Sequence, residues 1–224
     1  GTGVFVGRDR LASCRRASLG GFDLAILDDG FQHLRLARDL DIVLHRPGRN
    51  GYLREGFGAL RRADLVLCPA DPGPEGPFFP PGASPRLGAF SFRIQPESVV
   101  DLGSGRPAGL ESLRGKRAVA FCGIARPERF FNLLEELGLD IAVRISFPDH
   151  FSYPPRALAA ISSALGRAGA EAAVTTEKDG VKIEGSPSGA WPFPVYALRL
   201  AVELPEEVFQ AVDAAAARTE PRLG

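Results

Sequence analysis

Short apolar runs that end at polar or turn-forming residues recur along the chain and predict the strands of an α/β sheet. The first run, FDLAILDD at residues 22–29, ends in the two acids Asp28 and Asp29. Continuous apolar runs are typical of parallel strands covered on both faces. Similar runs follow at residues 41–44 and 64–67. The pattern predicts three buried parallel strands, half of an α/β domain cut at its front.

Strand and helix patterns alternate between residues 117 and 183, which predicts a second α/β unit. Pro127 and Glu128 suit the first turn of a helix, and Gly138 suits its C-terminal end. The predicted strands of this unit are RAVAFCGI from residue 117, 141–145 and 172–175. One predicted helix begins at Pro127 and a second lies around 158–165. A further helix, which closes the chain, is predicted after Pro205.

Proline and glycine crowd residues 69–88, which makes this stretch the best candidate for a domain boundary. Residues 90–94 and 196–200 alternate between apolar and polar, as half-exposed strands do, and we expect them to pair and connect two domains. The predicted fold is therefore α/β, with two Rossmann-like or P-loop-type domains joined by a two-stranded β hinge. The predicted parts are 1–88, the C-terminal part of a nucleotide and magnesium domain ending in a linker; 89–112, a hinge strand and connection; 113–192, the second α/β domain; and 193–224, the return strand and C-terminal helix.

The composition excludes several classes of protein. The 224 residues are 45% hydrophobic, which excludes a disordered polymer. Lys plus Arg and Asp plus Glu number 27 each, so bulk charge gives no reason to expect nucleic acid binding. Three widely spaced cysteines fit a reducing, cytoplasmic setting better than disulfides or a zinc site. No apolar stretch is long enough to cross a membrane, and no signal peptide is visible.

The sequence begins Gly1-Thr2-Gly3 and contains no methionine, so we expect it not to be an intact translation product.

The segment Asp28–His33, DDGFQH, is the first candidate for chemistry. In parallel α/β sheets, ligands bind beyond the carboxyl ends of the strands. An apolar strand that ends in acid has the form of a Walker B element, in which a carboxylate holds the Mg²⁺ bound to nucleotide phosphates. Asp-Asp-Gly is also ordinary turn chemistry, and this plainer interpretation stays open.

His150, in the sequence FPDH, is the second candidate, because it is one of only three histidines and follows a predicted strand. A histidine can act as a base, a proton relay or a ligand. Asp149 beside it either orients the imidazole or caps the next segment. A solvated surface histidine is the plainer alternative.

The third candidate is the segment Thr175–Asp179, TTEKD, with Lys182 beyond it. The chain has only three lysines, and Lys178 and Lys182 are two of them, as expected where a site needs a compact ammonium group. A Thr cap followed by Glu/Lys helix pairs explains the same residues without a site. The roles of Thr175, Thr176, Lys178 and Lys182 stay open at this point.

A fourth and weaker cluster contains Arg54 and Glu55, which could meet a phosphate and a metal, although charge clusters are usually solvated surfaces. The 224 residues contain no G-x-x-x-x-G-K-[ST] phosphate loop, no G-x-S-x-G and no H-E-x-x-H.

The motifs ILDDGFQHLRLARDLDIVL, GYLREGFGALRRADLVL, AFCGIARPERFFNLLEELG, FPDHFSY and VTTEKDGVKI together resemble the tetraacyldisaccharide 4'-kinases of lipid A synthesis. They occur in the family's order and cover nearly the whole chain. The resemblance implies transfer of the γ-phosphoryl group of ATP, with Mg²⁺, to the 4'-hydroxyl of an acylated disaccharide 1-phosphate. It implies two α/β domains and a peripheral place on the cytoplasmic face of the bacterial inner membrane, with this chain by itself soluble. No nucleic acid and no obligate protein partner are expected.

The resemblance also assigns roles to individual residues. Asp28 and Asp29 match the family's Walker B acids, and Gln32 and His33 complete that motif. Glu55 matches an acid near the metal and nucleotide, so that Asp28 and Glu55 are the expected metal ligands. His150 matches the histidine that the second domain brings to the cleft, where it partners a catalytic aspartate. Arg10 matches a basic residue near the phosphates.

The family's P-loop, its catalytic aspartate and its membrane-facing region are expected upstream of residue 1, so we expect this chain alone to be inactive or nearly so. A non-catalytic module that binds lipid-linked sugars is the alternative function. A two-domain sugar-nucleotide transferase is a third hypothesis, which no motif specifically supports.

Overall fold

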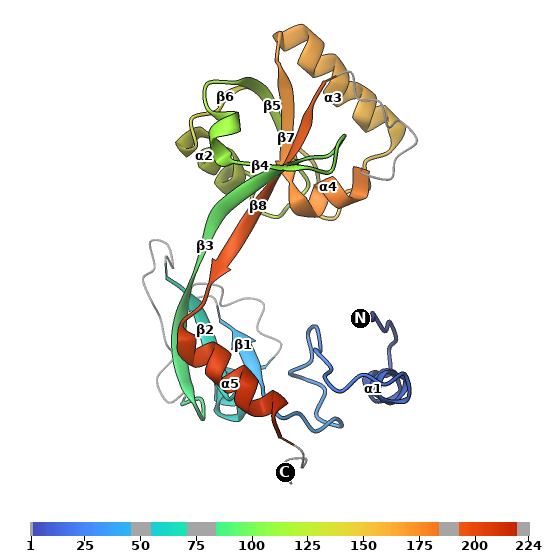
Figure 1. Cartoon of the computed structure of the whole chain (residues 1–224), viewed down its shortest axis with the longest axis vertical. Helices are drawn as coiled ribbons and strands as arrows, with labels where there is room; N and C mark the ends of the chain where they lie inside the picture. Colours follow the sequence, from blue (N-terminus) through green and yellow to red (C-terminus); the bar gives the residue numbers. More distant parts are fainter. Residues whose placement is uncertain (1, 46–54, 71–83, 184–192, 219–224) are drawn as a thin grey trace. The chain divides into compact units, whose positions relative to one another are not determined.

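The computed structural model describes residues 2–45, 55–70, 84–183 and 193–218 (Figure 1). The chain divides into two compact units: unit 1 is Gly1–Arg93 with Val202–Gly224, and unit 2 is Ile94–Ala201. Within the described residues, no helix combines the length and the apolar character that a membrane span requires.

The fold is mixed α/β, as the apolar runs predict. In the described residues one mostly parallel sheet has the strand order β1-β2-β3-β8-β7-β5-β6, and β4 pairs antiparallel with β3. The strands are β1 Ile42–Leu44, β2 Leu65–Pro69, β3 Gly88–Asp101, β4 Pro107–Ala108, β5 Arg117–Cys122, β6 Asp140–Ser146, β7 Ala172–Thr176 and β8 Val195–Glu203. The helices are α1 Arg10–Leu19, α2 Pro127–Glu136, α3 Pro155–Ala168, α4 Glu177–Ile183 and α5 Glu206–Ala216, with 3-10 helices η1 Phe57–Arg62 and η2 Leu110–Leu113.

Strand β5 explains why unit 2 has a core on both faces of its sheet. Its side chains alternate, so that Ala118 and Ala120 pack in one buried cluster with α2. Val119 and Phe121 pack in a second cluster with α3. Figure 1 shows α2 on one side of these strands and α3 on the other. The continuous apolar run from residue 117 therefore marks a strand covered on both faces, as predicted.

Helix α2 follows its sequence pattern closely. Pro127 occupies the first turn, where its missing N–H leaves no hydrogen bond unmade. Phe130 and Leu134 are buried on the face toward the sheet. Gly138 has a φ of +85°, a left-handed conformation that ends the helix and that glycine adopts at little cost.

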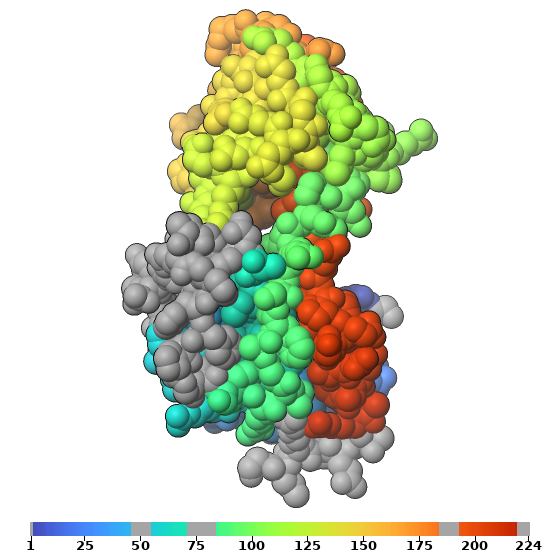
Figure 2. Space-filling view, turned by 90° about the vertical axis from the view of Figure 1, so that its left-hand side faces the viewer, coloured from blue at the N-terminus to red at the C-terminus, as the bar shows by residue number. Residues whose placement is uncertain are grey.

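Unit 1 is built on parallel pairing of β1 with β2 and of β2 with β3. Helix α5 belongs to this unit, because Val208 packs with Leu65 and Leu67 of β2. Val208 is only 2% exposed. Figure 2 shows α5, in red, beside the lower part of β3, in green.

The predicted buried strand at residues 22–29 is wrong. The structure has no strand there, and the side chains of Leu24 and Ile26 are 59% and 91% exposed. A run of apolar residues becomes a strand only where a neighbouring strand completes its hydrogen bonds, and no described strand pairs with this segment. Helix α1, which comes before it, was missed.

Strands β3 and β8, which contain the two alternating segments, are neighbours in the sheet, which confirms that these strands pair. The N–H of Leu102, just after β3, donates to the carbonyl of Val195, at the start of β8, at 2.8 Å. The end of one strand thus lies beside the start of the other, so the pair is antiparallel. The predicted domain boundaries and the hinge stay predictions.

Candidate functional site

The acidic turn of unit 1, residues 28–33, lies outside regular secondary structure. Asp28 and Asp29 are exposed, and Asp29 has a φ of +56°. The N–H of His33 donates to the carbonyl of Gly30 at 3.0 Å and closes the next turn. The plainer interpretation of Asp-Asp-Gly as a turn therefore describes the backbone. Within the described residues no hydrogen bond or ion pair engages the Asp28 carboxylate, so it remains open to a ligand.

Arg38 holds the acidic turn against the start of β1. Its guanidinium donates to the carbonyls of His33 and Leu36 at 2.7 and 2.9 Å, and to Asp41 Oδ1 at 2.5 Å. Asp41 directly precedes β1, and its N–H donates to the buried carboxylate of Asp64 at 2.9 Å. This arginine was not predicted as part of the site. It lies in an Arg-rich sequence that offers no local sign of its role.

Glu55 is linked to the acidic turn through one arginine. Arg62 Nη2 donates to Glu55 Oε2 at 2.7 Å, and the same guanidinium lies 5.0 Å from the ring centre of Phe31. The structure thus connects Glu55 with the turn that contains Asp28, while their role as metal ligands stays a prediction.

The other predicted residues of unit 1 have less distinctive surroundings. Gln32 is exposed and His33 is half-buried. Arg10 begins α1 and donates to the carbonyl of Gly7 at 2.7 Å, and no contact among the described residues joins it to the acidic turn. Within the described residues, no group of three or more His, Cys, Asp or Glu side chains could hold a metal ion.

In unit 2, three parallel strands end at the same edge of the sheet. Strand β5 leads into Gly123, β6 into the loop with Asp149 and His150, and β7 into α4 with Lys178. The carboxyl edge of a parallel sheet is where α/β proteins bind ligands. The second and third candidates of the sequence therefore meet at one edge.

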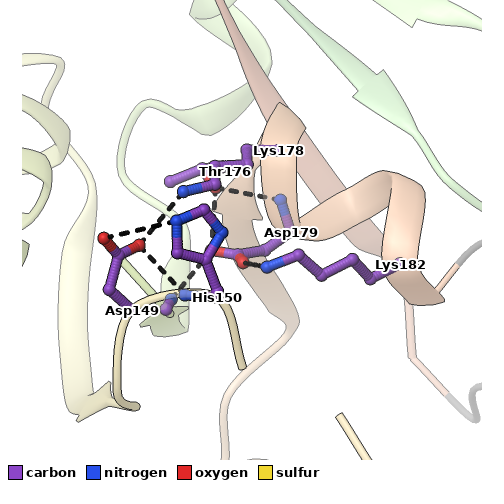
Figure 3. Close-up of polar contacts among 7 residues, drawn as sticks. Asp149, His150, Thr176, Lys178, Asp179 and Lys182 are labelled. Carbon is purple, nitrogen blue, oxygen red and sulfur yellow. Dashed lines mark hydrogen bonds and ion pairs between the residues drawn. The ribbon is translucent and has the colours of Figure 1, made fainter. Parts of the chain in front are cut away.

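His150 has a strained backbone and an accessible ring (Figure 3). Its φ is +61°, a region that non-glycine residues rarely adopt, and its side chain is 79% exposed. Its N–H donates to Asp149 Oδ1 at 3.0 Å, and Lys178 Nζ donates to the same oxygen at 3.0 Å. The hydrogen bond from Lys178 holds the pKa of Asp149 below its usual value. Asp149 is therefore a carboxylate shared between the loop and α4.

Asp179 joins α4 to β5 beneath this loop, and it is fully buried (Figure 3). Its carboxylate accepts hydrogen bonds from the N–H of Gly123 at 2.8 Å, from Thr176 Oγ1 at 2.9 Å and from Lys182 Nζ at 2.8 Å. Burial acts to raise the pKa of Asp179, but the three donors outweigh it, and the pKa lies below its usual value. Thr176 also caps α4, since its Oγ1 accepts from the N–H of Asp179 at 3.2 Å.

Three aromatic rings hold the other side of the His150 loop. Phe147 and Phe151 stack with ring centres 4.6 Å apart, and Tyr153 lies edge-on to both at 5.2 Å. Tyr153 is 4% exposed and has a φ of +51°. Burial, followed by the nearby charge of Asp179, raises the pKa of its phenol. Non-glycine residues persist in such conformations only where the surrounding structure enforces them.

Gly123 allows this loop to approach β5. A Cβ atom at this position would lie 3.1 Å from Tyr153 Oη and 3.2 Å from both Phe151 Cβ and the carbonyl oxygen of Pro148. Because one of these atoms is backbone, a side chain at position 123 requires the loop to move.

We therefore expect Gly123→Ala to destabilise unit 2 by about 1–3 kcal/mol, the usual cost of overpacking, and to shift the backbone amide resonances of residues 148–153. Urea unfolding and amide spectra of the chain measure both effects. Gly166→Ala is the matched control, because nothing lies within 4 Å of its Cβ position in α3, and there alanine favours the helix. Equal stability of the two variants would contradict the close approach.

Comparisons with known proteins identify the family to which the chain is similar. A family model for tetraacyldisaccharide-1-P 4'-kinase matches residues 1–217. A tetraacyldisaccharide 4'-kinase of Pelobacter propionicus is 44% identical over 176 residues, covering 73% of this chain and 47% of that protein. One of Anaeromyxobacter sp. (strain K) is 39% identical over 251 aligned positions, covering 99% of this chain and 64% of that protein.

The fold comparison agrees. The crystal structure of an LpxK from Aquifex aeolicus in complex with ATP matches with a TM-score of 0.63 and 25% identity, covering 91% of this chain and 62% of that one. The chain thus spans between about half and under two thirds of the length of these relatives. Since the family model extends over almost all of its residues, the chain belongs to the tetraacyldisaccharide-1-P 4'-kinase family.

Proposed function

We propose that this chain forms part of an ATP-dependent kinase that phosphorylates the 4'-hydroxyl of tetraacyldisaccharide 1-phosphate in lipid A biosynthesis. The observation that carries the proposal is the family match over residues 1–217, which includes both the acidic turn and the FPDH loop. The 224 residues contain no Walker A motif, so we propose that transfer requires a longer polypeptide than this chain alone.

The acidic turn supports a role in nucleotide and Mg²⁺ binding. Mg²⁺ prefers one or two carboxylates and keeps several waters, so a site with few protein ligands suits it. Asp28 has an exposed carboxylate, and Glu55 is linked to the same turn through Arg62 and Phe31. When bound, Mg²⁺ neutralises charge on the phosphates. Asp28 and Glu55 would hold the ion, directly or through water, with Asp29, Gln32 and His33 as the surrounding polar residues. Arg10 is proposed as a basic residue near the phosphates.

His150 supports a role in proton transfer. Its ring is exposed on a loop whose backbone is fixed from two sides, so the imidazole can meet a ligand from a defined starting position. In the proposed reaction it partners a catalytic aspartate outside this chain and helps to remove the proton of the attacking hydroxyl.

We further propose that β3 and β8 act as a two-stranded hinge between a nucleotide domain and a second α/β domain. Both strands contribute residues to each compact unit, which supports this view. The acylated substrate supports a further part of this proposal, that the enzyme acts at the cytoplasmic face of the inner membrane.

The alternative is a module that binds the lipid-linked sugar without transferring phosphate. This alternative predicts binding of the disaccharide without any ATP-dependent product.

The deciding experiment measures transfer of ³²P from Mg-ATP to the tetraacyl disaccharide 1-phosphate. The chain is assayed alone and together with the sequence encoded in frame upstream of residue 1. We expect transfer only by the longer polypeptide, and a loss of about 10²–10⁴-fold in its His150→Ala variant. Asp140→Ala, which breaks an exposed ion pair with Arg117 in the same unit, controls for a substitution away from the proposed site. A folded longer polypeptide that binds the disaccharide and transfers nothing would establish the binding module instead.

A further inference from the structure

The backbone of His150 is strained, yet little holds its imidazole directly. Within the described residues its ring has one polar neighbour, Asp149 Oδ2, and the distance from Nε2 is 3.8 Å, too long for a hydrogen bond. The shorter contact is the 3.0 Å hydrogen bond from its backbone N–H to Asp149 Oδ1. A group that holds the Asp149 carboxylate in place therefore also holds the backbone of His150, from which its side chain extends.

Lys178 is the group that fixes Asp149. Its ammonium donates to Asp149 Oδ1, the same oxygen that accepts from the N–H of His150, at 3.0 Å (Figure 3). We propose that Lys178 is a positioning residue for His150, acting through the Asp149 carboxylate. The catalytic part of this inference rests on the proposed kinase function, whereas the structural part does not.

The start of α4 is rigid enough for Lys178 to act in this way. The next residue, Asp179, is buried and tied to Gly123, Thr176 and Lys182. Lys178 therefore extends from a backbone that is anchored to β5, and its ammonium draws Asp149 toward α4.

The residue type suits the task. Three of the 27 basic residues are lysine, so at position 178 the chain departs from its strong use of arginine. An ammonium is a compact charge with three donors, which can approach a single carboxylate oxygen that already accepts from a backbone N–H. A planar guanidinium favours two parallel bonds to both oxygens, and here Oδ2 is the oxygen nearer the His150 ring.

A second ion pair on the same turn separates this role from that of an ordinary surface pair. Arg199 Nε donates to Glu177 Oε1 at 2.8 Å, with side-chain exposures of 46% and 50%. The Lys178–Asp149 pair has exposures of 46% and 40%. Exposed pairs of this kind contribute little to stability. Only the Lys178 pair touches the His150 loop, so Arg199→Gln is the matched control for Lys178→Gln.

The first test does not depend on activity. The backbone and ring resonances of His150 are assigned in the 224-residue chain by comparison with His150→Gln, a simple task since the chain has three histidines. We expect Lys178→Gln to shift the resonances of Asp149 and His150 strongly, Lys178→Arg to shift them partly, and Arg199→Gln to leave them in place. Equal shifts in the Lys178→Gln and Arg199→Gln variants would overturn the positioning role.

The second test uses the longer polypeptide in the phosphoryl-transfer assay. We expect Lys178→Gln to lower kcat about tenfold with the KM for ATP nearly unchanged, because misplacement of a reacting group by about 1 Å can cost up to ~10²-fold. When His150 is already alanine, adding Lys178→Gln should not lower kcat any further. A further tenfold fall in kcat in this double variant would mean that Lys178 does not act through His150. If His150→Ala alone keeps wild-type transfer, the proposed function of His150 fails, and the resonances still decide whether Lys178 positions it.

Discussion

Replacing Asp179 with alanine is expected to destabilise unit 2 by about 3–5 kcal/mol, since it breaks a buried ion pair. The carboxylate is fully buried, and its loss leaves the N–H of Gly123 without its acceptor and Lys182 without its counter-charge. Amide hydrogen exchange of β5 and α3, together with urea unfolding, measures the change in the free energy of unfolding of this unit.

The direction of the pH dependence follows from the lowered pKa of Asp179. Its folded-state pKa lies below the unfolded value of about 3.9, so the stabilisation is complete above that value and is lost as the pH falls through the folded pKa. The difference in the free energy of unfolding between the wild type and Asp179→Ala should therefore become smaller only at acidic pH.

Asp140→Ala is the matched control, because Asp140 forms an exposed ion pair with Arg117 at 2.8 Å. We expect it to cost at most about 1 kcal/mol. If the two variants were equally stable at pH 7, the buried hydrogen bonds of Asp179 would not stabilise unit 2 as proposed.

Replacing Asp28 with asparagine in the longer polypeptide is expected to lower kcat by about 10²–10³-fold, the range found when one group that stabilises transition-state charge is removed. Asparagine keeps the shape of the side chain and removes its charge, so the loss should grow at low Mg²⁺ concentration. Initial rates measured across a Mg²⁺ titration test both expectations.

Asp39→Asn removes an exposed carboxylate from a neighbouring stretch of unit 1 and should leave kcat and the Mg²⁺ dependence nearly unchanged. A similar small effect of both substitutions would remove Asp28 from the proposed metal site and leave Glu55 as the remaining carboxylate candidate.

Most of unit 2 was predictable because its signals are local. The apolar run that forms β5 and the Pro127-to-Gly138 pattern of α2 each specify an element within about ten residues, and the structure has both. The run at residues 22–29 has the same local form and gives no strand. Burial of a strand depends on a neighbour in space, and no local pattern contains that information.

The candidate site also contains residues that local sequence indicates and residues whose role depends on distant parts of the chain. The sequence indicates His150 and the acidic turn, because histidines are rare here and acids after an apolar run are distinctive. It also indicates the segment that ends at Asp179, but it does not distinguish a buried anchor there from a common helix cap. The burial of Asp179 depends on a hydrogen bond to Gly123, which is 56 residues away in the sequence.

Unit 1 is formed by two stretches of sequence on either side of unit 2, and this has a consequence for synthesis on the ribosome. Helix α5 supplies Val208, which packs on Leu65 and Leu67, but it emerges only after all of unit 2. At about 5–20 residues per second, the stretch between Arg93 and Val202 delays its arrival by roughly 5–20 s. Unit 2 is continuous and can fold during this interval. The packing of Val208 on β2 is therefore completed only after the whole of unit 2 has been synthesised, so unit 2 can be folded before unit 1 has its full core.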